Sequence, residues 1–97
     1  MAICVRVISN LGEVRGEAAG VEVNRLCRRA SAAGMPGLGH VDEYDDTYFN
    51  LSQMRLVIPE LERLAESARP DEADTVQRLL NLARMVRIHD QMIFVGD

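Results

Sequence analysis

The spacing of the apolar residues changes twice along this chain, and that change constrains the fold more than any other feature. In residues 2–9 (AICVRVIS) β-branched residues stand at every second position, which is typical of a strand. Between residues 21 and 87 three segments instead repeat their apolar residues every three or four positions, as one face of a helix does. Residues 92–95 (MIFV) form a short apolar run of strand type. Strands at both ends with helices between them predict an α+β domain.

The expected order of elements is strand, weak strand, helix, loop, helix, helix, strand. Val14–Ala18 is expected to return from a turn at residues 10–13 and form a hairpin with the first strand. The first and last strands are predicted to be neighbours in a small antiparallel sheet, with the three helices on one face. A single globular domain is expected to cover residues 1–97.

The second helix has the clearest start signal. Asn50 is a favourable N-cap, and Gln53 three positions later completes a variant of the capping box. Phe49 and Met54 match the positions of a hydrophobic staple. Pro59 is expected to kink this helix rather than end it, because the apolar pattern continues beyond the proline.

Charge and hydropathy exclude several classes of function. Fifteen acidic and eleven basic residues give a net charge of -4, so binding to nucleic acid is not expected. No apolar run approaches the ~20 residues of a membrane span, and residues 1–10 lack the pattern of a secretory signal. The two cysteines, Cys4 and Cys27, are expected to be reduced and buried, and the protein to be cytoplasmic.

Residues 42–46 form the densest polar feature of the chain. Four carboxylates surround one tyrosine in this segment: Asp42, Glu43, Tyr44, Asp45 and Asp46. Their spacing does not match an EF-hand, and no second histidine stands near His40, so neither a metal site nor a cofactor is predicted. We predict that the segment binds a basic partner protein, with Tyr44 as an anchor. The alternative is a solvated loop without a binding role.

A second candidate site lies on the first predicted helix. All eleven basic residues of the chain are arginines, and Arg25, Arg28 and Arg29 fall on the polar face of this helix. Arg25 and Arg29 are one turn apart, so the cluster has the spacing to clamp a phosphate or a carboxylate. The alternative is a solvated helix face.

No catalytic residue is predicted. The serines lie in no nucleophile-elbow motif, and the glycine-rich loop at residues 34–39 lacks the Gly-Lys-Ser/Thr of a phosphate-binding loop. The predicted function is therefore a non-enzymatic protein-interaction module, such as an immunity or antitoxin-like protein that binds a basic partner surface. The alternative is a small regulatory domain that binds an anionic metabolite through Arg25, Arg28 and Arg29. Oligomeric state, including a homodimer, is left open.

Three segments carry a resemblance to other proteins. Thr47-Tyr48-Phe49-Asn50-Leu51-Ser52-Gln53-Met54, Leu61-Glu62-Arg63-Leu64 and the ending Phe94-Val95-Gly96-Asp97 make the chain resemble a group of small uncharacterised bacterial proteins. In that group a Thr-x-Phe-Asn-x-x-Gln-Met segment opens a helix, and the chain ends in Phe-Val-Gly-Asp. The resemblance covers about the C-terminal half and implies no catalytic residue. This chain differs from the group by placing Pro59 within the helix.

Overall fold

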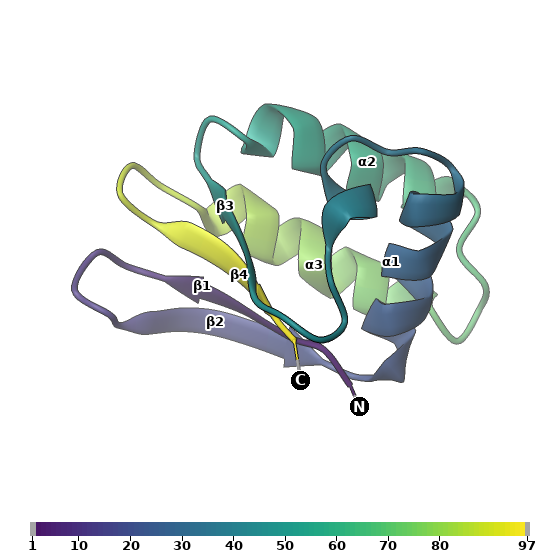
Figure 1. Ribbon diagram of the computed structural model, residues 1–97, viewed down its shortest axis with the longest axis horizontal. Coiled ribbons are helices and arrows are strands. Elements are labelled where there is room, and N and C mark those ends of the chain that lie inside the picture. The colour runs from purple at the N-terminus through teal and green to yellow at the C-terminus, as the bar shows by residue number, and fades with distance from the viewer. Residues whose placement is uncertain (1, 97) are drawn as a thin grey trace.

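The two ends of the chain build the centre of one sheet, and the helices come from the middle. A computed structural model describes residues 2–96 (Figure 1). Within them the elements are β1 (Cys4–Ile8), β2 (Val14–Ala19), α1 (Val21–Ala32), the short 3-10 helix η1 (Leu38–His40), β3 (Thr47–Asn50), α2 (Met54–Glu66), α3 (Ala73–Met85) and β4 (Gln91–Val95). The predicted α+β class is confirmed.

The sheet is antiparallel throughout, in the order β2-β1-β4-β3. The first and last strands of the chain are neighbours, with Val5 opposite Phe94 and Val7 opposite Met92. The weak second strand is present and forms the predicted hairpin with β1. Both predictions of strand pairing are therefore confirmed.

A fourth strand, β3, was not predicted. Its buried residue Phe49 lies opposite Met92, and its ring packs edge-on against Phe94 with ring centroids 5.7 Å apart. The two capping-box hydrogen bonds are formed: the Gln53 N–H donates to Asn50 Oδ1 at 3.0 Å, and the Asn50 N–H donates to Gln53 Oε1 at 2.8 Å. The predicted helix start is nevertheless wrong. Asn50 ends a strand, residues 51–53 form a turn, and the α-helix begins at Met54.

Only one face of the sheet is covered. In Figure 1 the three helices lie on the same side of the sheet. The side chains of Val5, Val7, Met92 and Phe94 point into this layer and are fully buried, whereas Tyr48 on the neighbouring edge strand is 52% exposed. Helix α2 runs through the proline without a break. The helices contribute most of the remaining core: Val23, Leu26, Ala30, Val57, Leu61, Leu64, Val76, Leu79, Leu80 and Ala83.

Two predictions of burial are wrong. Leu51 was expected on the apolar face of the second helix, but it lies in the turn before α2 and is 43% exposed. Cys4 is half-buried, because its strand phase is opposite to that of the inward-pointing residues of β1. Cys27 is buried, and that burial, with the nearby Glu43 charge, raises the pKa of its thiol to about 12. Both thiols are free, as predicted.

The buried carboxylate of Glu60 fixes the loop that leads toward residues 42–46. It lies on α2 and accepts hydrogen bonds from the backbone N–H groups of Gly37 at 3.0 Å and Leu38 at 2.6 Å. Buried carboxylates need such donors, because an unsatisfied charge in the interior is costly. A Cβ added at Gly37 would lie 3.0 Å from a Glu60 oxygen, so glycine suits this contact.

Candidate functional site

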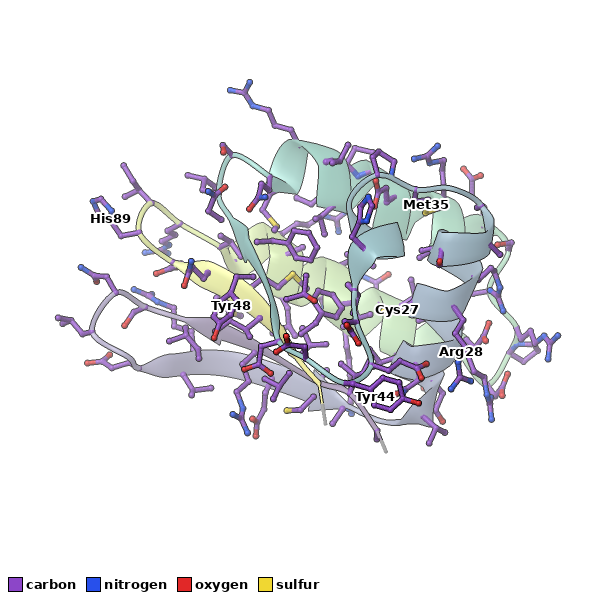
Figure 2. All side chains as sticks on the ribbon, viewed as in Figure 1. Cys27, Arg28, Met35, Tyr44, Tyr48 and His89 are labelled. Atoms are coloured by element: carbon purple, nitrogen blue, oxygen red, sulfur yellow. The ribbon has the colours of Figure 1, made fainter. Side chains whose placement is uncertain are left out.

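The acidic loop, defined here as residues 42–46, connects η1 to the edge strand β3. Tyr44 is 79% exposed, and Asp42, Asp45 and Asp46 are also exposed. Glu43 alone is turned partly inward. Figure 2 shows Tyr44 on the same side of the molecule as Arg28, far from His89. The structure therefore presents three of the four predicted carboxylates and the tyrosine on the surface.

Hydrogen bonds to the backbone give the acidic loop a defined shape. Asp42 Oδ1 accepts the Tyr44 N–H at 2.8 Å, and Asp45 Oδ1 accepts the Asp46 N–H at 2.8 Å. Asp46 Oδ1 accepts the Gly96 N–H at 3.1 Å, which ties the loop to the end of β4. A Cβ at Gly96 would collide with the backbone nitrogen and oxygen of Asp45. The Gly of the Phe-Val-Gly-Asp ending is therefore explained by packing, and Asp97 lies outside the described residues.

The fourth carboxylate connects the two sites that the sequence suggested. Glu43 forms an ion pair with Arg28 of α1, with 2.6 Å between Glu43 Oε1 and Arg28 Nε. Arg28 was a candidate for anion binding, and Glu43 was a candidate for binding a basic partner. In the fold each neutralises the other, so neither is a free charge at its site.

The other two candidate arginines are also paired with carboxylates at the start of α3. Arg25 Nη1 lies 2.7 Å from Asp71 Oδ2, and both side chains are largely exposed. Arg29 Nη2 donates to both oxygens of Glu72, at 2.7 and 2.9 Å. A metabolite anion would have to compete with these carboxylates, and the anion-binding alternative stays a prediction without support from the geometry.

Glu72 is a structural residue that the sequence analysis missed. It is fully buried, and besides Arg29 it accepts the backbone N–H of Arg69 at 3.0 Å. Burial of the carboxyl raises its pKa, but the Arg69 N–H and the Arg29 guanidinium together lower it by more, so the net pKa lies below its ordinary value. The run Arg69-Pro70-Asp71-Glu72 is the signal that could have shown it. A proline is favoured near a helix start, and a Glu three residues after Arg69 can accept the Arg69 N–H as in a capping box.

Within residues 2–96 no three His, Cys, Asp or Glu side chains are grouped so that they could hold a metal ion. None of the helices in this range has the length and apolar character needed to cross a bilayer.

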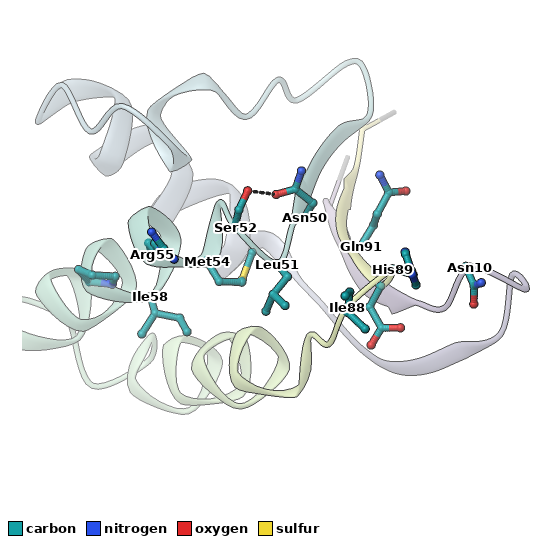
Figure 3. A pocket seen from close by; sticks show the side chains of 12 residues that line it. Asn10, Asn50, Leu51, Ser52, Met54, Arg55, Ile58, Ile88, His89 and Gln91 are labelled. Atoms are coloured by element: carbon teal, nitrogen blue, oxygen red, sulfur yellow. Dashed lines mark hydrogen bonds between the residues drawn. The ribbon is translucent and has the colours of Figure 1, made fainter.

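A groove of about 1000 Å³ lies at the other end of β3 from the acidic loop (Figure 3). Its apolar walls come from Leu51 in the turn before α2, Met54 and Ile58 on α2, and Ile88 in the turn before β4. The sequence analysis missed it, because segments far apart in the chain form it. No signal in the sequence indicated it, because Leu51 was expected within the second helix rather than in a turn.

No protein-family model matches this sequence, and no curated protein or solved structure matches it either.

Proposed function

We propose that this protein is a non-enzymatic protein-interaction module that binds a basic surface of a partner protein through its acidic loop. One observation carries the proposal: Asp42, Asp45 and Asp46 are exposed and take part in no ion pair within residues 2–96. By contrast, the acidic residues that lie against α1 are neutralised by arginines. Unpaired carboxylates on one loop attract and orient a cationic partner.

Tyr44 and the shape of the loop support a binding role. Tyrosine is enriched at interfaces because its ring buries a large area while its hydroxyl keeps a hydrogen bond. The bonds that Asp42 and Asp46 make to the backbone fix the loop before any partner arrives. A partner therefore loses little affinity to ordering of the loop.

The specific role that we propose is that of an immunity or antitoxin-like protein in the cytoplasm. A small acidic protein can inhibit a basic enzyme by covering its positively charged surface, and long-range attraction makes such association fast. The proposal needs no catalytic group on this chain, and its partner is a protein with a cationic surface.

The test is a charge-neutral variant, Asp42→Asn/Asp45→Asn/Asp46→Asn. Asparagine keeps the Oδ1 acceptor of each loop hydrogen bond, so the variant should unfold at nearly the wild-type temperature. Glu43 is left unchanged because of its ion pair with Arg28. Binding is measured by surface plasmon resonance against the partner isolated by crosslinking to the wild-type protein. We expect association to slow by at least tenfold and its salt dependence to weaken.

The matched control, Glu13→Gln/Glu66→Gln/Asp74→Asn, removes the same amount of charge from exposed positions outside the loop. It should bind nearly as the wild type does. If both triple variants bind equally well, the loop is not the binding site. If both lose binding equally, net charge rather than the loop governs the association.

A further inference from the structure

The groove at the far end of β3 combines apolar walls with one arginine that has no ion-pair partner within residues 2–96. Leu51 and Ile88 are 43% and 71% exposed, so apolar surface faces solvent on both walls. Figure 3 shows them with Met54 and Ile58 around the same opening. A volume of about 1000 Å³ lies at the upper end of the usual range for small-molecule sites.

The strand register explains why these residues meet. Ile8 lies opposite Gln91, and Asn50 lies opposite the same Gln91. The last residues of β1 and β3 and the first residue of β4 therefore lie at the same end of the sheet. The turns that leave this end bring Leu51 and Ile88 to the same groove although they are 37 positions apart in the chain.

Arg55 supplies the charge. It lies on the first turn of α2, lines the groove and is exposed, and it forms no ion pair within residues 2–96. The carboxylate of Asp90 also lines the groove, but it is buried and already engaged by Arg15 at 3.4 Å and by the Arg87 N–H at 3.0 Å. The charge available to a ligand is therefore positive, although the whole protein is acidic.

The turn before β4 adds an independent observation. His89, which lines the groove, has a φ of 69° and is the one non-glycine residue with positive φ among residues 2–96. Such backbone strain is concentrated at binding and catalytic sites. The preceding residue, Ile88, lines the groove and is largely exposed.

We propose that the groove binds an amphipathic monocarboxylate, with its aliphatic chain along the apolar walls and its carboxylate on Arg55. The walls contain aliphatic side chains and one methionine, which suit a flexible chain better than a ring that needs stacking partners. The guanidinium matches a carboxylate through two parallel hydrogen bonds. This site is separate from the acidic loop, so a result that contradicts one proposal does not affect the other.

The experiment is an NMR titration of the ¹⁵N-labelled protein with sodium octanoate, below the concentration at which octanoate forms micelles. We expect shifts of the backbone amides in residues 51–58 and 88–91. Arg55→Gln should weaken octanoate binding about tenfold, as the loss of one charge-assisted contact predicts. The matched control Arg63→Gln removes an exposed arginine from the last turn of the same helix and should leave binding unchanged.

Three further ligands and variants separate the outcomes. Ile88→Gln should weaken octanoate about fivefold without loss of folding, because this side chain is exposed. Octanol should bind more weakly than octanoate, and equal binding would overturn the role of Arg55. If N-acetyl-leucyl-isoleucine, whose carboxylate ends a peptide rather than an alkyl chain, shifts the same amides and binds more tightly than octanoate, the site takes a peptide C-terminus and the proposal of an alkyl-chain ligand is wrong. Absence of any octanoate-induced shift in the groove would also overturn it.

Discussion

Glu72→Gln tests whether one buried carboxylate joins α1 to the start of α3. Glu72 accepts two hydrogen bonds from Arg29 and one from the Arg69 N–H. Glutamine keeps one acceptor oxygen, but it turns an NH2 group toward the guanidinium. A hydrogen bond to a charged group contributes about 1.5–3 kcal/mol, and the lower half applies because the Arg29 side chain is 29% exposed. We expect the free energy of unfolding to fall by about 2 kcal/mol.

Urea denaturation followed by far-UV circular dichroism measures this loss. For a domain of this size the slope is about 1–1.5 kcal/mol per molar urea, so the midpoint should fall by roughly 1.3–2 M. Asp71→Asn is the matched control, since it breaks the adjacent ion pair with Arg25, whose side chains are 44% and 57% exposed. The control should cost less than about 0.5 kcal/mol.

The pH dependence gives a second readout of the same carboxylate. Burial raises the pKa of Glu72, but the Arg69 N–H and Arg29 lower it by more, and the net pKa is below its ordinary value. A carboxyl with a lower pKa in the folded state stabilises the fold above its unfolded-state pKa, about 4.3, and loses this contribution as pH falls through the folded-state pKa. The difference between wild type and Glu72→Gln should thus be complete at pH 7 and shrink below about pH 4.3. A difference under 0.5 kcal/mol at pH 7, or one that does not shrink in acid, would refute the reasoning.

Three further predictions concern other contacts of the fold. Gly96→Ala should cost about 1–3 kcal/mol in a thermal melt, because its Cβ collides with the Asp45 backbone, and an unchanged melting temperature would contradict that contact. His89→Gly should stabilise the protein by about 0.5–1 kcal/mol by relieving the positive φ, and a lower stability would show that the imidazole makes a favourable contact. A polar maleimide should label Cys4 in the folded protein and Cys27 only after unfolding, as single-cysteine variants would report. Equal labelling rates would contradict the assigned burial.

The sequence predicted those elements whose apolar residues repeat often enough to set a period. The helices and the terminal strands meet this condition, and pairing of the first and last strands followed from their positions. The strand β3 does not meet it, because it has four residues with one of them, Phe49, buried. Its last residue, Asn50, also fits an N-cap, so the local signal favoured a helix start. Competition between a short strand and a capping signal is decided by the partner strand, which local sequence does not show.

The residues of the candidate sites were predicted from the sequence, but their ion-pair partners within the fold were not. Exposure of Asp42, Tyr44 and Asp45 followed from their polarity. The pairing of Glu43 with Arg28 depends on contacts between residues 15 positions apart, and that of Arg29 with Glu72 on residues 43 apart. No periodicity encodes such distances. The groove was not predicted either, because the residues of its walls are far apart in the chain and meet only in the folded sheet.

The place of β4 between β1 and β3 has a consequence for synthesis of the protein. Strand β4 pairs with β1 on one side and with β3 on the other, so it alone connects the β1–β2 hairpin to β3 within the sheet. Until residues 91–95 emerge from the ribosome, the nascent chain therefore holds the β1–β2 hairpin, the unpaired strand β3, and helices whose apolar faces lack a complete sheet. Pairing of β1 with β4 then joins residues as far apart in sequence as Cys4 and Val95, and strand pairing over such a separation is slow because of the entropy of closing the loop. A chaperone that binds exposed apolar segments of nascent chains would have its longest opportunity immediately before β4 appears.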